Sequence, residues 1–513
     1  MRHYFSAKFC FMTNRTCALF IAILLFSGGA SAQLDTLVFK AFLDKVYTDF
    51  ELPSMAVSIV KDGKTVLTYA KGIRSENDQQ GPDANTLYGI ASLSKAFTAA
   101  SIGMLVDDGL LKWNDPVVKH LPNFKLHDPS VTQHFTVEDL LSHRSGLITF
   151  DGDLLWYGTN YTRTEVMERI QYRPLTHEFR NEFGYQNIMF ISAGELIEKV
   201  SGMTWDAFVK TRILDPLKMN RTTSNFDTFY KDENIAKPFI NGKEIFMLSY
   251  DNSGATAALN SSAGDMSKWM NFWLANGLVD GDTLLSSKAI HEIWSMHTNL
   301  NTSGFDDANG TNFKGYGLGW FLMDYNGKKI AHHGGGLPGY ITKVALSPKD
   351  DFGIVILTND MSSASSMLMY AALDWLEGKE IEAWSEKFLG FKKGGETREI
   401  EEKAKRLKTK KTNPKVLASS KYVGTYRDEM YGNAEVLIEN GQLVLSMIPS
   451  KELFTGLLTP WDDNAFKFDH NDPFLTYGVV TFNAENGLVN GFKIDLPNYD
   501  FHFDKLDFKK IAQ

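Results

Sequence analysis

Leu87-Tyr88-Gly89-Ile90-Ala91-Ser92-Leu93-Ser94-Lys95 opens a segment in which small and apolar residues recur at helical spacing as far as Gly109. Ser92 and Lys95 are three residues apart, so on a helix they share one face and the ammonium can reach the hydroxyl. A helix N-terminus also favours an oxyanion. Ser-x-x-Lys alone is a weak signal, because Ser58-Ile59-Val60-Lys61 also matches it. That second match lies on a predicted strand, where its two side chains would point to opposite faces.

A second short motif, Tyr185-Gln186-Asn187, precedes an apolar helical pattern. From an extended loop, its tyrosine and asparagine can both point into one cleft. Tyr431-Gly432-Asn433 has the same form, and the structural alternative for either is a half-buried tyrosine beside an asparagine turn.

The third motif is His333-Gly334-Gly335-Gly336-Leu337-Pro338-Gly339-Tyr340, which lies between two predicted strands. Glycines allow the backbone to approach a ligand closely, and free N–H groups there can bind an oxyanion. The alternative is a glycine-rich hairpin with a solvated histidine. The strand–glycine–helix order of a nucleotide-binding loop is missing, so phosphate binding is not expected.

The pattern around these motifs mixes helices with hairpin-like strands. Residues 55–60 and 65–69 flank an Asp62-Gly63 turn and predict a β-hairpin. We therefore expect an α+β fold, with an antiparallel sheet flanked by helices plus a helical domain. Helices are predicted at 136–141 (with an N-terminal cap), 188–200 and 262–275, and strands at 316–323, 341–347 and 352–358, with glycine-rich loops between the strands.

The composition changes near Ser385. Residues 392–411 are dense in Lys, Arg and Glu, with i,i+4 pairs such as Glu399/Lys403. This predicts a charged, solvated helical linker over 386–418, with a basic binding patch as the alternative. Short alternating runs then predict a small all-β module over 419–513, a barrel or a sandwich.

The N-terminal residues 1–32 have the form of a secretory signal peptide. They contain three basic residues and no acidic one, then a short apolar run from Ala18 to Phe26, then an A-x-A ending before Gln33. The alternative is an uncleaved anchor, but the run is too short to span a bilayer. Both cysteines, Cys10 and Cys17, lie in this segment. We expect a periplasmic or secreted protein with no cysteine ligand and no stable membrane insertion after cleavage.

The composition excludes several classes of protein. The chain has 513 residues, a net charge of −9, 43% hydrophobic and 22% charged residues, which is typical of a globular protein. An acidic balance argues against nonspecific nucleic-acid binding. His332 and His333 are adjacent and no H-E-x-x-H occurs, so no metal is expected, and nothing indicates a cofactor.

In this order, S-x-x-K, Y-x-N and H-x-G resemble the serine β-lactamase and penicillin-binding protein superfamily. The branch with the greatest similarity is the class C β-lactamase-like hydrolases, which include DD-peptidases, D-aminopeptidases and esterases. The resemblance spans about 52–377, includes 140–147 and 315–320, and places the hydrolase domain at 33–385. The C-terminal module resembles the small lipocalin-like domain appended to many of these hydrolases.

The resemblance implies roles for individual residues. It implies that Ser92 is the nucleophile with Lys95 beside it, that Tyr185 is the base or relay, that Asn187, His333 and Gly335 bind substrate, and that the backbone N–H groups of Ser92 and Gly336 form the oxyanion hole. Whether Lys95 or Tyr185 takes the serine proton stays open, since either free pKa, about 10, needs lowering.

We therefore expect an exported serine hydrolase that forms an acyl-enzyme on Ser92. Its substrate would be a small molecule or short peptide with an amide or ester bond, and D-amino-acid peptides, including peptidoglycan-derived ones, are candidates. One alternative is a true class C β-lactamase, although His333 replaces the permanent cation that such enzymes keep. The other alternative is a catalytically idle binding or scaffolding protein.

Overall fold

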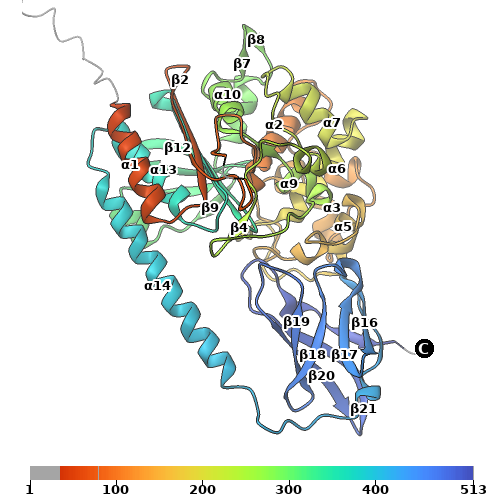
Figure 1. Cartoon of the computed structure of the whole chain (residues 1–513). Coiled ribbons are helices and arrows are strands. Elements are labelled where there is room, and N and C mark those ends of the chain that lie inside the picture. Colours follow the sequence, from red (N-terminus) through yellow and green to blue (C-terminus); the bar gives the residue numbers. More distant parts are fainter. Residues whose placement is uncertain (1–34, 79, 512–513) are drawn as a thin grey trace, which may run out of the picture.

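The computed structural model describes residues 35–78 and 80–511. The predicted signal peptide, residues 1–32, lies outside the described residues. The chain forms a mixed helix-and-sheet part and a C-terminal closed β-barrel, connected by one long helix (Figure 1). This confirms the predicted α+β class with an appended small barrel.

An antiparallel sheet of eight strands organises the first part, in the order β2-β1-β14-β13-β12-β11-β10-β9. The predicted hairpin forms its first two strands, and Asp62 and Gly63 both have positive φ in the connecting turn (52° and 70°). The strands are β1 (Ser54–Lys61), β2 (Lys64–Gly72), β9 (Thr298–Leu300), β10 (Lys314–Tyr316), β11 (Phe321–Tyr325), β12 (Lys328–Leu337), β13 (Tyr340–Ser347) and β14 (Phe352–Thr358).

Two strand predictions near the third motif were wrong. The strand predicted at 316–323 is broken into β10 and β11, because Gly319 turns the chain with a φ of 75° and Trp320 is fully buried in that turn. His333 and the glycines after it are not loop residues. They lie in β12, which pairs with β13 as far as Leu337↔Tyr340. The glycines obscured the strand because they weaken its pattern.

Helices cover both faces of the sheet (Figure 1). One buried cluster joins the sheet to α1, α13 and the start of α14, and a larger one joins its other face to α10 and the helical domain. The helices predicted at 92–109, 136–141, 188–200 and 262–275 are confirmed as α2, α4, α6 and α10. The main helices are α1 (Thr36–Asp49), α2 (Ser94–Asp107), α4 (Val137–Leu140), α5 (Arg163–Arg169), α6 (Asn187–Ser201), α7 (Trp205–Val209), α9 (Gly254–Ala257), α10 (Ala263–Leu274), α11 (Ser287–Ile293), α13 (Ala364–Leu376) and α14 (Glu382–Leu407).

The charged segment predicted as a helical linker lies largely in α14. Its first turns bury Trp384 and Phe388, and the rest runs exposed along the outside of the molecule towards the barrel (Figure 1). Among the described residues, no helix is both long and apolar enough to cross a bilayer. The barrel strands are β15 (Gly424–Asp428), β16 (Gly432–Glu439), β17 (Gln442–Met447), β18 (Thr455–Asp462), β19 (Ala465–His470), β20 (Gly478–Glu485), β21 (Leu488–Asp495) and β22 (Phe508–Lys510).

The barrel packs directly on the helical domain. The Tyr157 hydroxyl donates to Asp472 Oδ2 at 2.8 Å, and the ring of Tyr157 lies 4.2 Å from that of Phe501. His502 Nε2 lies 2.8 Å from the Thr149 carbonyl oxygen. These contacts place one end of the barrel beside the loops that carry the second motif.

Candidate active site

The first motif occupies a tight turn at the start of α2. Ser92 lies in the 3₁₀ turn Ala91–Leu93, and Ala91 has a φ of 51°, a left-handed conformation that residues other than glycine rarely adopt. Lys95 Nζ lies 2.9 Å from Ser92 Oγ. The three-residue spacing therefore brings the amine and the hydroxyl into hydrogen-bond contact, as the sequence indicated.

Lys95 is fully buried and held by uncharged groups. Its Nζ lies 2.7 Å from Asn187 Oδ1 and 3.1 Å from the Thr256 carbonyl oxygen. Burial lowers the pKa of Lys95 well below its usual value, and the charge of Asp153 only partly opposes this. Burial thus favours the uncharged amine, whose free lone pair is what a general base requires.

Asn187 couples Lys95 to a second buried group. Its Nδ2 donates to Asp153 Oδ2 at 2.6 Å, while its Oδ1 also accepts from Thr256 Oγ1 at 2.8 Å. Burial raises the pKa of Asp153 to about 8, so this carboxyl is mostly protonated at neutral pH. A neutral Asp153 no longer stabilises the charged form of Lys95.

Tyr185 is placed by backbone contacts with the loop after α4. Gly184 N donates to the His143 carbonyl oxygen, and Gln186 N donates to His143 Nδ1, both at 2.9 Å. Phe150 N donates to the Tyr185 carbonyl oxygen at 2.7 Å. Burial raises the pKa of Tyr185, and a hydrogen bond with Ser92 only partly opposes the shift. The phenol therefore stays protonated at neutral pH.

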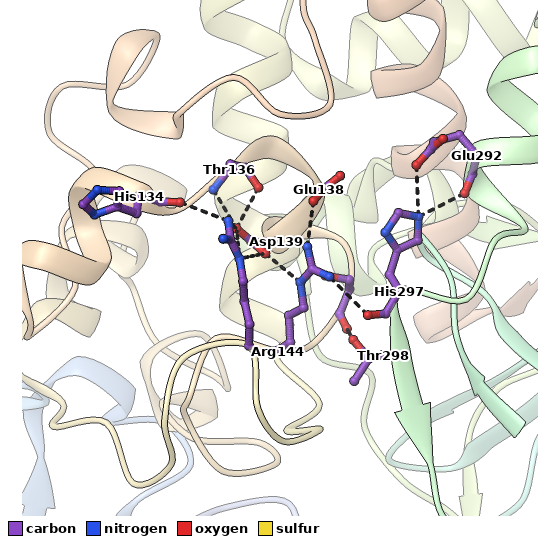
Figure 2. Close-up of polar contacts among 10 residues, drawn as sticks. His134, Thr136, Glu138, Asp139, Arg144, Glu292, His297 and Thr298 are labelled. Carbon is purple, nitrogen blue, oxygen red and sulfur yellow. Dashed lines mark hydrogen bonds and ion pairs between the residues drawn. The ribbon is translucent and has the colours of Figure 1, made fainter.

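A buried carboxylate anchors that loop (Figure 2). Asp139 is fully buried and accepts from Arg144 Nε at 2.7 Å and from Arg180 Nη2 at 2.6 Å. It also closes the capping box with Thr136 at the start of α4. Arg144 immediately follows His143, so these ion pairs fix the backbone that supports Tyr185.

His333 lies in the core of the site and is 1% exposed. Its Nδ1 lies 2.7 Å from the Gly334 carbonyl oxygen, and its Nε2 lies 3.0 Å from the Tyr316 hydroxyl. Nδ1 is thus the protonated nitrogen and Nε2 accepts from Tyr316. Burial, with the nearby charge of Lys95, lowers the pKa of His333 to about 3. The imidazole is neutral at physiological pH.

The glycines bring β12 against the nucleophile turn. A Cβ on Gly335 would lie 2.3 Å from the Ile90 carbonyl oxygen and 2.4 Å from Thr342 Oγ1, so only glycine fits there. β11 pairs with β12 only as far as Phe321↔His332. From His333 to Leu337, β12 has one edge that no described strand covers, and Gly336 on this edge lines the same cleft as Ser92.

The cleft has a volume of about 550 Å³. It is lined by the predicted residues Ser92, Tyr185, Asn187, His333 and Gly336, and also by three barrel residues, Phe474, Asp500 and Phe501. Lys95 and Gly335 lie directly behind this lining. The structure therefore brings the three motifs together, and the similar Tyr431-Gly432-Asn433 lies in the barrel, where the Tyr431 hydroxyl pairs with Ser450.

One cluster among the described residues has metal-binding side chains. Ligand atoms of Glu138, Glu292 and His297 lie within 4.8 Å of one another (Figure 2). The Arg144 guanidinium already pairs with Glu138 Oε1 at 2.8 Å, and none of the three lines the cleft. These groups form part of the ion-pair network around Asp139, and we assign no metal to them.

Several site residues had no assigned role at the level of sequence. Tyr316 and His143 lie inside the stretches 315–320 and 140–147, which resemble the family, so their place in those stretches could have identified them as site residues. Asp153 and Lys343 have no pattern around them that marks them. The three barrel residues lie more than 380 positions after Ser92, and only the fold shows that they reach the cleft.

Comparison with known proteins agrees with this geometry. The Beta-lactamase family model matches residues 39–379, and a domain of unknown function, DUF3471, matches residues 408–510. A penicillin-binding protein homologue from Pyrococcus abyssi, described as octameric, shares the fold with a TM-score of 0.59 at 23% identity, covering 93% of this chain and 100% of its own.

Two curated relatives span much of the chain. The unguisins hydrolase ungD' of Aspergillus campestris is 29% identical over 431 residues, which are 78% of this chain and 76% of that protein. Protein flp of Staphylococcus aureus strain MW2 is 28% identical over 345 residues, 65% of this chain and 64% of its own. Since the family model covers most of its length, the chain belongs to the Beta-lactamase family, whose fold is generally that of serine hydrolases.

Proposed function

We propose that the chain is a serine hydrolase that cleaves an amide or ester bond through an acyl-enzyme on Ser92. The observation that carries this proposal is the 2.9 Å contact between Ser92 Oγ and the buried Lys95 amine. A neutral serine hydroxyl is a poor nucleophile at pH 7 and needs an adjacent base. The same contact favours an active hydrolase over an idle scaffold.

Lys95 is the base in this proposal, and Tyr185 is the proton donor. Burial favours the neutral forms of both the amine and the phenol, so Lys95 can accept the Ser92 proton while Tyr185 retains its own. After the tetrahedral intermediate forms, Tyr185 protonates the leaving group and takes up the proton that Lys95 received from Ser92, so the phenol and the amine both return to their neutral forms. The backbone N–H groups of Ser92 and Gly336 stabilise the oxyanion.

The substrate in this proposal is a small molecule or short peptide. The cleft volume suits a ligand of that size. The exposed edge of β12 can also pair with an extended chain through main-chain hydrogen bonds. D-amino-acid peptides remain candidates, as does export to the periplasm, which rests on the N-terminal sequence alone.

Labelling with a fluorescent fluorophosphonate tests the nucleophile. The wild type should be labelled and Ser92→Ala should not. Ser58→Ala is the matched control, because Ser58 belongs to the other S-x-x-K match, on β1, and should leave labelling intact. Lys95→Met should slow labelling by about 10²- to 10⁴-fold. Equal labelling of wild type and Ser92→Ala would refute the proposal.

A further inference from the structure

The end of α14 and the segment after it concentrate positive charge. Residues 403–427 contain nine basic residues and no acidic one, although acidic residues outnumber basic ones in the whole chain, 62 to 53. The acids of α14 all lie before this run, between Glu382 and Glu402. Cations in the last turn of a helix oppose the helix dipole, but this run continues well beyond Leu407, where α14 ends. Helix stability therefore does not account for it.

Part of this charge faces solvent without a carboxylate beside it. Lys405, Lys408 and Lys410 are exposed, and none of the three forms an ion pair with a described residue. The Nζ of Lys410 lies 5.8 Å from the ring centroid of a barrel tryptophan, which leaves its charge in place. Lys403 and Lys411, in contrast, both pair with carboxylates. Three uncompensated ammonium groups within six residues attract an anionic surface.

The same part of α14 exposes apolar side chains. Ile400 is 68% exposed and Leu407 is 57% exposed. They are seven residues apart, so they lie on one side of the helix, with Ala404 between them. Arg406 lies on a different side, which faces the barrel, because its Nη1 donates to the Tyr477 carbonyl oxygen at 2.9 Å. The barrel therefore leaves the apolar side chains uncovered.

Residues 400–410, which we call the basic segment, are separate from the catalytic cleft. None of them lines the cleft, and the last turns of α14 lie beside the barrel after the helix has left the hydrolase part (Figure 1). Lysines beside exposed apolar side chains are typical of helices that bind anionic membrane surfaces, where the apolar groups enter the headgroup region and the ammonium groups lie near phosphates. A soluble anionic polymer would use the charge alone. The exposure of Ile400 and Leu407 therefore favours a lipid surface.

We propose that the basic segment holds the protein on an anionic lipid surface by peripheral contact. The chain as a whole has a net charge of −9, so an anionic surface repels most of the molecule and contact is restricted to this segment. One lysine near such a surface contributes about fivefold to partitioning, so Lys405, Lys408 and Lys410 together contribute about 10²-fold. This inference goes beyond the proposed hydrolysis and does not depend on it.

Flotation of the full chain with increasing amounts of vesicles tests this proposal. One set of vesicles is phosphatidylcholine alone, and the other is phosphatidylcholine and phosphatidylglycerol in equal parts. The wild type should float with the anionic set only, and salt at about 1 M should weaken that binding. The triple variant Lys405→Gln/Lys408→Gln/Lys410→Gln should bind about 10²-fold more weakly. The matched control removes three exposed lysines of the hydrolase part and should bind like the wild type: Lys112→Gln/Lys243→Gln/Lys288→Gln.

A second variant, Ile400→Gln/Leu407→Gln, tests the apolar part of the contact. It should bind anionic vesicles about tenfold more weakly, because it loses apolar burial, and should leave any binding to soluble polyglutamate unchanged. Vesicle binding equal to that of the wild type would overturn the lipid surface in favour of an acidic polymer. No binding of the wild type to anionic vesicles, or an equal loss in the matched control, overturns the proposal altogether. Every variant should hydrolyse a soluble aryl ester and melt like the wild type, so failure of the hydrolase proposal is observed separately.

Discussion

Gly335→Ala is expected to impair the site while leaving most of the fold intact. The new Cβ would start 2.3 Å from the Ile90 carbonyl oxygen, and real Cβ contacts essentially never fall below 3.0 Å. β12 must therefore move by about 0.7 Å or more relative to the turn that carries Ser92. That motion shifts the Gly336 N–H, the proposed oxyanion donor.

A displacement of this size at an active site lowers the catalytic rate by a known range. A shift of about 1 Å at an active site lowers rates by about 10²-fold, and loss of one oxyanion donor by about 10²- to 10³-fold. We expect kcat for an aryl ester to fall in that range, which is a barrier increase of about 3 to 4 kcal/mol. The KM should change much less.

The assay is steady-state hydrolysis of the ester by wild type, Gly335→Ala and Gly334→Ala. Gly334 is the matched control, since the nearest atom to a Cβ there is 3.7 Å away, an ordinary contact. Its alanine variant should lose no more than a few-fold. If folded Gly335→Ala keeps kcat within threefold of wild type, the steric argument and the assignment of Gly336 are both wrong.

Three further predictions follow from the described contacts. Tyr185→Phe should lower kcat by about 10²-fold or more for an amide and far less for a p-nitrophenyl ester, whose leaving group needs no proton; equal losses would contradict the donor role. Asp139→Asn should destabilise the protein by about 3 kcal/mol in urea unfolding at pH 7, because it removes the buried carboxylate that both Arg144 and Arg180 contact. Burial alone would raise the pKa of Asp139, but hydrogen bonds from Arg180 and Thr136 and the charge of Arg144 hold this pKa below 3.8. The contribution of Asp139 to protein stability is therefore present above that pH and is lost as the pH falls through the lowered folded pKa. The variant should lack this loss of stability in acid. Phe501→Ala should lower the melting temperature and weaken discrimination between small and bulky acyl groups in kcat/KM, since Phe501 both packs on Tyr157 and lines the cleft; unchanged discrimination would show that the barrel does not shape the site.

Local patterns predicted the elements that depend on local chemistry. The Asp62-Gly63 hairpin and the Thr136 cap formed as expected because turn and cap preferences act over a few residues. The strand through His333 was missed, because its stability comes from pairing with β13 rather than from its own glycine-rich sequence. Partners from distant parts of the chain outweighed local preference there.

The candidate site could be predicted in part. Motif order indicated that Ser92, Lys95, Tyr185 and His333 share one cleft, and the structure places them together. The environment of those groups could not be predicted. Whether an amine is charged depends on burial and on neighbours such as Asp153, which is contributed by a loop 58 positions away from Lys95. Such neighbours leave no periodic signal.

The uncovered edge of β12 has a consequence for how specificity can change within this architecture. Main-chain amides and carbonyls recognise only the backbone of a bound chain, so this edge accepts varied side chains equally well. Preference among acyl groups must then originate in the walls around it, and Phe474 and Phe501 of the barrel supply part of those walls. A chimera that joins the C-terminal barrel of one relative to the hydrolase domain of another should therefore take its acyl-group preference from the barrel, while its catalytic residues stay unchanged.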